Sequence, residues 1–255
     1  MIKLIKCEYM KTKRKHIFLT TFALLVLMGM WAFYGTSSKD MSDFIRQNGY
    51  TMFLYQFPLV NAIFFPLLCT VIASRLCEHK GGNFKLLCTM EDKGKIFDVK
   101  LIYGLTIVIS GVILFWILTI VYGKIVGFTE AFPINNYLLY LLFTIIPTAS
   151  IYIFQHSLSM IFKNQAIPFF VGVIGEFTGL FSMFLPQFPF LRKSILWGYY
   201  GALQFVGLFG WDKQTRFDNA YFGVMTIDWP AFALLVCLLI LIYIVGKYIF
   251  SKKEF

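Results

Sequence analysis

The sequence predicts an all-α polytopic membrane protein with six transmembrane helices, both termini in the cytoplasm, and a re-entrant or interfacial external segment before the last helix. Hydrophobic residues make up 58% of the 255 residues and charged residues only 14%, which is unlike a soluble domain. The apolar residues form long continuous blocks, which indicates burial in lipid. No soluble unit separates from these blocks, so residues 1–255 form a single predicted transmembrane domain.

The amino-terminal segment Met1–Lys15 carries six basic residues before the first apolar block. Ile17–Tyr34 is longer than the core of a usual signal peptide, and no small-residue cleavage site follows it. We therefore expect it to be retained as the first span.

A helix needs about 20 apolar residues to cross the ~30 Å hydrocarbon layer. By this measure the chain offers six spans, which are Ile17–Tyr34, Met52–Ser74, Val99–Tyr122, Tyr137–Phe162, Ala166–Leu185 and Trp229–Phe250.

The distribution of Lys and Arg predicts the orientation of these spans. With the amino terminus inside, the inner segments hold 16 of the 23 Lys and Arg residues and the outer segments hold seven. This bias also places the carboxyl terminus in the cytoplasm of a multi-pass cell-membrane protein. The net charge of +10 is thereby explained by topology and by contact with membrane lipid, and no nucleic-acid partner is expected.

The apolar stretch 195–210 leaves two topologies open, because it could be a seventh span. Its 16 residues include four glycines, which suits a re-entrant or interfacial element better than a full crossing. The whole external segment 186–228 is rich in aromatic residues. These form either an aromatic belt at the membrane surface or a surface that receives an amphipathic ligand from the outer leaflet.

Polar groups inside the predicted spans are the candidate functional residues. Glu176 lies near the middle of the fifth span, where a carboxylate is costly; it lies on a transport path or at a subunit contact, or it is a buried anchor. His156 in the fourth span is a satisfied polar residue or a proton relay. Gly172, Gly175 and Gly179 share one face of a helix and permit close packing within the chain or against a partner.

The sequence contains none of the motifs HExxH, GxSxG or GxxxxGK[ST], so we expect no catalytic residue and no bound cofactor. The three histidines are scattered and the cysteines lack zinc-site spacing, so no metal site is expected. Any nucleotide chemistry would belong to another polypeptide.

The longest inner connection runs from Arg75 to Lys100, and we expect it to meet a cytoplasmic partner. Gly81-Gly82 breaks the chain, and Asn83 can cap a short helix in which Phe84 and Leu87 share a face. The alternative is an ordinary loop on the lipid headgroups.

The sequence EHKGGNFKLLCTM, at residues 78–90, resembles the segment between spans two and three of ABC-2-type transporter permeases, in particular the lantibiotic-protection group. The lead-in CEYMKTKRK resembles the interfacial helix that opens those permeases, which implies such a helix over residues 1–15. Gly82 makes the first motif one residue longer than the family pattern.

The resemblance implies the permease subunit of an ABC exporter, in which ATP and magnesium bind to separate cytoplasmic ATPase subunits. Glu78, Asn83, Phe84 and Lys85 would then seat in a groove of the ATPase, with Leu87 in the same coupling loop. A second permease, identical or different, would complete the transporter. The implied function is removal of lantibiotic peptides from a bacterial plasma membrane, which gives immunity or resistance.

Two alternatives stay open at this point. One is an ABC-2 permease for another substrate, such as bacitracin, a lipid or a different peptide. The other is a membrane carrier or sensor outside the ABC class, which would be expected to show paired intramembrane charges or internal repeats.

Overall fold

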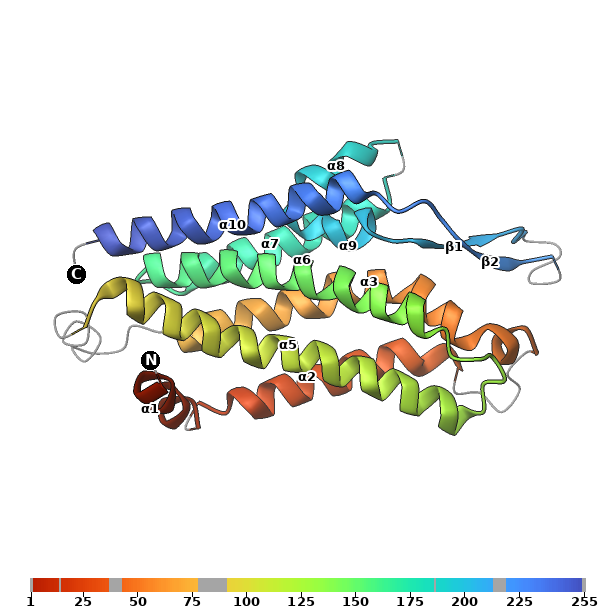
Figure 1. Ribbon diagram of the computed structural model, residues 1–255, viewed down its shortest axis with the longest axis horizontal. Coiled ribbons are helices and arrows are strands. Elements are labelled where there is room, and N and C mark those ends of the chain that lie inside the picture. The colour runs from red at the N-terminus through yellow and green to blue at the C-terminus, as the bar shows by residue number, and fades with distance from the viewer. Residues whose placement is uncertain are drawn as a thin grey trace.

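The computed structural model describes residues 2–13, 15–36, 43–77, 91–185, 187–212 and 219–253. Long helices run roughly along one axis and make up most of this part of the chain (Figure 1). They are α2 (Ile17–Phe33), α3 (Asp43–Leu76), α5 (Lys93–Val126), α6 (Ile134–Ile161), α7 (Ala166–Met183) and α10 (Trp229–Lys252).

These helices confirm the prediction of an all-α polytopic membrane protein. Helices α3, α5, α6, α7 and α10 are each long and apolar enough to cross a membrane. Helix α2 has 17 residues and meets α1 (Ile2–Lys13) at a bend of 67°; the two together satisfy the same test as a sixth span. The 17 residues of α2 measure about 26 Å along the helix axis, close to the thickness of the hydrocarbon layer.

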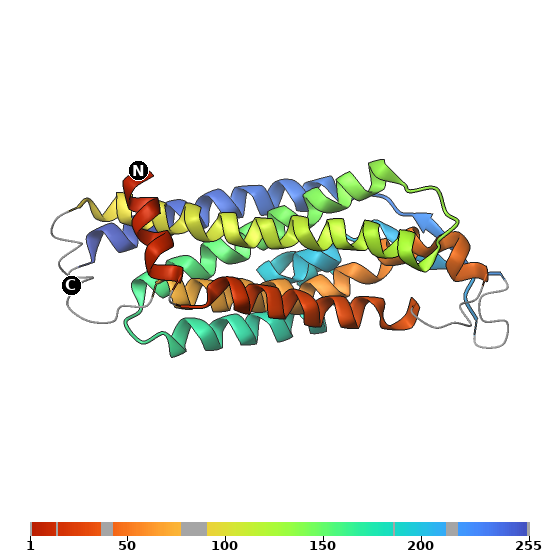
Figure 2. The same cartoon turned by 90° about the horizontal axis from the view of Figure 1, so that it is seen from below.

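The two termini lie at the same end of the molecule, together with the end of α3 and the start of α5 (Figure 1). The charge bias of the sequence predicts that this end faces the cytoplasm. Helix α1 crosses the bundle at this end rather than continuing along the axis of α2 (Figure 2). This orientation suits the predicted interfacial helix, because it places a polar helix at the level of the headgroups.

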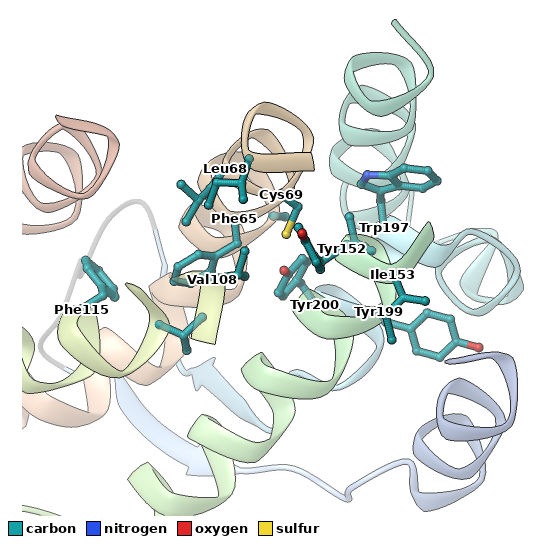
Figure 3. Close-up of a cluster of buried hydrophobic side chains, with 14 of the residues drawn as sticks. Phe65, Leu68, Cys69, Val108, Phe115, Tyr152, Ile153, Trp197, Tyr199 and Tyr200 are labelled. Atoms are coloured by element: carbon teal, nitrogen blue, oxygen red, sulfur yellow. The ribbon is translucent and has the colours of Figure 1, made fainter. Parts of the chain in front are cut away.

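Helix α3 is the centre of the bundle, since it contacts α2, α5, α6 and α7. Its buried aromatic residues stack on their neighbours: the Phe53 and Phe57 rings lie 5.0 Å apart and nearly parallel, and Phe57 also packs on Phe115 of α5. Figure 3 shows part of this core, where Phe65, Phe115 and Val108 lie together. Close contact of this kind holds membrane helices together, because lipid itself supplies no hydrophobic drive.

The glycine face of α7 packs within the chain. A Cβ atom on Gly172 would lie 2.3 Å from Thr70 Oγ1, and one on Gly175 or Gly179 would lie 2.4 or 2.5 Å from the Trp197 side chain. Of the two partners that the sequence leaves open for this face, the structure shows the one inside the same chain. The absence of side chains lets α7 approach α3 and the external segment closely.

The external segment enters the bundle and leaves it again without crossing. It consists of α8 (Pro189–Ser194), η2 (Leu196–Gly198), α9 (Tyr199–Ala202), β1 (Val206–Phe209) and β2 (Tyr221–Val224). The Tyr200 hydroxyl lies 2.7 Å from Thr148 Oγ1, halfway along α6. Stretch 195–210 therefore is no seventh helix; it contains two short turns of helix and a strand.

Strands β1 and β2 form an antiparallel hairpin that sequence patterning did not predict. Val206 pairs with Val224 and Phe209 with Tyr221, and the rings of Phe209 and Tyr221 stack 5.6 Å apart. The hairpin extends beyond the helices at the end opposite the termini (Figure 1). The strands are only four residues long and two of their eight positions are glycine, so their sequence gives little strand signal.

Candidate coupling site at the end that carries both termini

The predicted coupling connection is shorter than its sequence suggested. Helix α5 begins at Lys93, so the range 93–100 is helical rather than loop. Asp92 begins this helix, because its carboxylate accepts a hydrogen bond of 2.8 Å from the Gly94 amide. On the other side of the connection, α3 continues to Leu76. The end of α3 and the start of α5 are the two roots of this connection.

The five residues predicted to contact an ATPase lie outside the described residues; they are Glu78, Asn83, Phe84, Lys85 and Leu87. What the structure shows is how the two roots of this connection are held.

A buried ion pair ties the amino-terminal helix to both roots. The Lys100 ammonium lies 2.9 Å from a Glu8 carboxylate oxygen, and each side chain is only 7% exposed. The same ammonium donates a hydrogen bond of 2.8 Å to the Leu76 carbonyl, one of the last carbonyls of α3. Lys100 thus joins α1, the end of α3 and the first turns of α5 through one charged group.

The environment of Glu8 keeps it ionised. Burial alone raises the pKa of this carboxyl, but the charges and hydrogen bonds of Lys100 and Lys11 outweigh burial, so the pKa of Glu8 lies below its ordinary value. Lys11 is the weaker partner, because its nitrogen lies 3.2 Å from Glu8 and its side chain is half exposed. At neutral pH, α1 therefore holds a carboxylate against the buried Lys100.

Four further hydrogen bonds fix the end of α1 and the start of α2 against the bundle. Thr12 Oγ1 lies 2.7 Å from the Tyr103 hydroxyl, one turn beyond Lys100 on α5. Lys15 donates to the Arg75 carbonyl at 2.6 Å, and Arg75 donates to the Lys15 carbonyl at 2.9 Å. Arg75 also donates to Thr20 Oγ1, so the last turn of α3 is bonded to the bend between α1 and α2 and to the first turn of α2.

Helix α10 is tied to the same part of α5. The Lys247 ammonium lies 2.6 Å from the Asp98 carboxylate, which also accepts a hydrogen bond from the Tyr243 hydroxyl. Lys93, in the first turn of α5, donates to the Lys253 carbonyl at 2.7 Å. The first two turns of α5 are therefore bonded to α1 on one side and to α10 on the other.

His156 lies near the end of α6, beside the ends of α3 and α5. It is fully buried; its Nδ1 atom is 3.3 Å from the Cys77 sulfur, and its ring meets the Phe97 ring edge-on at 4.7 Å. Within the described ranges, no three His, Cys, Asp or Glu side chains form a group able to hold a metal.

Glu176 lies apart from this network, half-buried on α7. The predicted site residues therefore fall in three places: His156 at the roots, Glu176 and the glycine face on α7, and the coupling residues beyond the described part. The sequence missed the Glu8–Lys100 pair, although Glu8 is the one acidic residue in a basic segment.

This network joins α1, α3, α5 and α10 at the end of the molecule that carries the termini. Lys100 bonds α5 to α1 and to the end of α3, and Asp98 bonds α5 to α10. Buried ion pairs and packed helices resist separation.

Comparison with known families fits this membrane architecture. Residues 4–179, well over half of the chain, match the family described as ABC-2 family transporter protein. The chain belongs to the ABC-2 transporter family. It is accordingly a membrane permease component of an ABC transporter, and this membership implies association with an ABC ATPase subunit. No match was found among curated proteins.

The match covers α1 through most of α7, including the Glu8–Lys100 pair and both roots of the connection. The re-entrant segment, the hairpin and α10 lie beyond it. The matched region of this ABC-2 permease thus holds the bonds of Lys100 to α1 and α3, whereas the bonds between α5 and α10 reach beyond it.

Proposed function

We propose that this chain is the permease subunit of an ABC exporter that removes amphipathic antimicrobial peptides of the lantibiotic class from a bacterial plasma membrane. The observation that carries the substrate class is a groove of about 860 Å³ in the outer half of the bundle. Helices α2, α3 and α7 supply Trp31, Leu59 and Met183, and the carboxamides of Gln56 and Gln204 line the same space.

The position of the groove suits a ligand that arrives from lipid. Helix α3 lies between α2 and α7 (Figures 1 and 2) and contacts both. Trp31 is 57% exposed and Phe184, at the end of α7, is 62% exposed. A ligand dissolved in the outer leaflet therefore meets an apolar wall with a few polar groups, which is how sites for amphipathic molecules are built.

The energy for export would come from the ATPase partner. In this proposal the segment EHKGGNFKLLCTM seats in the ATPase, which holds ATP and magnesium, and the bonded roots pass its movement to α1, α5 and α10. A second permease, identical or different, completes the pathway. The same groove also suits other amphipathic cargo, such as a bacitracin-like drug. The test of this proposal therefore compares protection against a lantibiotic with protection against bacitracin.

Leu59→Trp is expected to reduce protection against a lantibiotic several-fold, because the larger ring fills part of the groove. The measurement is the growth-inhibiting concentration of a lantibiotic for sensitive bacteria that express this chain with its ATPase and second permease. The matched control is Ile240→Trp on the exposed surface of α10, which should protect like the unmodified chain.

Peptide recovered in the medium and in the membrane fraction completes this experiment. If protection extends to bacitracin and not to lantibiotics, the substrate class proposed here is wrong. If Leu59→Trp and Ile240→Trp behave alike at equal membrane levels, the groove is not on the export route.

A further inference from the structure

We propose that Glu176 binds the cationic group of an amphipathic ligand whose apolar part lies in the groove between α2, α3 and α7. This inference rests on the proposed export function and adds to it a charge requirement. The ligand class is an amphipathic peptide with a primary amine or guanidinium group, oriented with this group toward the middle of the membrane.

Glu176 has no ionic or hydrogen-bond partner in the described part of the chain. The carboxylates of Glu8 and Asp98, in contrast, are both paired. A carboxylate within a transmembrane helix is costly unless it is paired or faces a cavity. The Glu176 carboxylate is therefore open to a cationic partner from outside the described part of the chain.

Helical spacing places Glu176 deeper along α7 than the groove lining, on the same side as Met183. Glu176 precedes Met183 by seven residues, or two helical turns, so the two side chains share a face and lie about 10 Å apart along the axis. Met183 lines the groove. Glu176 is also four residues after Gly172, which packs on Thr70 of α3, so its side chain lies at the edge of the packed face rather than on the lipid side.

The groove itself offers a polar group, the carboxamide of Gln56, which likewise has no hydrogen-bond partner within the described ranges. The Arg192 guanidinium occupies the outer end of α7, where it donates to the Ser182 and Met183 carbonyls. The guanidinium repels a cation at the outer end of α7, so the attraction for a cationic group lies deeper, at Glu176.

Charge complementarity selects among the possible occupants. The acyl chain of a lipid beside Glu176 would leave the carboxylate unpaired, and so would an apolar surface of a second copy, such as the exposed side of α2. A cationic amphipathic peptide fills the groove and supplies the missing partner at once. Charge-assisted hydrogen bonds of this type are about twice as strong as neutral ones.

The test measures direct binding to the full chain in phosphatidylcholine nanodiscs, without ATPase or lantibiotic. The probe is a dansyl-labelled, leucine-rich dodecapeptide with one lysine, compared with the same peptide carrying glutamine in place of lysine. Energy transfer from Trp31 reports occupancy, because Trp31 lines the groove. The signal lost in the Trp31→Phe variant defines the groove-specific part.

We expect the lysine peptide to bind about tenfold more tightly than the glutamine peptide. Glu176→Gln should remove this difference and leave binding of the glutamine peptide unchanged. Leu180→Lys should also remove it, because a lysine four residues after Glu176 supplies an internal partner. This second variant keeps the test valid if Glu176→Gln does not fold, as judged by thermal melting.

Three outcomes would overturn the proposal. Equal binding of both peptides to the unmodified chain would make the groove a site for lipid or any apolar chain. A preference that persists in a folded Glu176→Gln variant would place the cation elsewhere. A Glu176→Gln variant whose oligomeric state shifts while its binding of both peptides stays unchanged would assign the carboxylate to contact with a second copy.

A fourth result separates this site from the proposed function. If the unmodified chain prefers the lysine peptide but gives no lantibiotic protection in bacteria, the proposed substrate is wrong and the Glu176 site stands.

Discussion

Lys100→Met is expected to destabilise the protein by about 3 kcal/mol, because it leaves a buried carboxylate without its main partner. Glu8 is 7% exposed and would retain only Lys11, which is half exposed and 3.2 Å away. The Leu76 carbonyl would also lose its donor at the end of α3. The measurement is the thermal unfolding of the purified chain in nanodiscs, together with the rate at which protease cleaves near α1.

The double variant Glu8→Gln with Lys100→Met should recover most of this loss, since it removes the orphan charge along with its partner. Lys124→Met is the matched control, because Lys124 is an exposed lysine at the other end of the same helix. A Lys100→Met protein that unfolds at the temperature of the unmodified chain would show that the pair does not hold α1 in place.

Gly179→Leu is expected to cost about 3 kcal/mol and to displace the re-entrant segment from the bundle. A Cβ atom at this position would lie 2.5 Å from Trp197 Cβ and 2.8 Å from the Trp197 carbonyl carbon. Because part of the obstacle is backbone, a change of rotamer cannot relieve the clash, and overpacking of this kind costs 1–3 kcal/mol or more. Tryptophan fluorescence of the folded protein and its thermal unfolding measure the effect.

The control is Gly29→Leu on α2, where an added Cβ meets only the Phe33 ring, at 3.6 Å. This variant should unfold at nearly the temperature of the unmodified protein. If Gly179→Leu leaves both the Trp197 environment and the stability unchanged, α7 and the external segment do not pack as closely as the structure shows.

The spans could be predicted from the sequence because hydrophobic blocks of this length have few other uses. The start of α5 could not. Lys93, Asp98 and Lys100 resemble a polar loop when read in order, yet each is bonded to a distant segment, to α10 or α1. Pairing across 92 residues, as between Glu8 and Lys100, leaves no local signal.

The external segment shows a second limit. Within it, the length and the four glycines of stretch 195–210 favoured a re-entrant element over a seventh span, and the structure has no seventh helix there. Its β-hairpin was missed, because the pairing of Val206 with Val224 is a contact between two short strands that only the folded bundle brings together. Glu176 was recognised from its cost in lipid, but the groove beside it depends on how α2, α3 and α7 pack.

The central claim is that energy enters through residues 78–90 and reaches the bundle through the roots of this segment. The most direct test is Glu78→Gln with Lys85→Gln, expressed with the ATPase and the second permease, with Lys124→Gln as control. We predict that recovery of the ATPase with the purified permease falls strongly and lantibiotic protection is lost, while membrane insertion stays unchanged. Unchanged ATPase recovery together with unchanged protection would contradict the account.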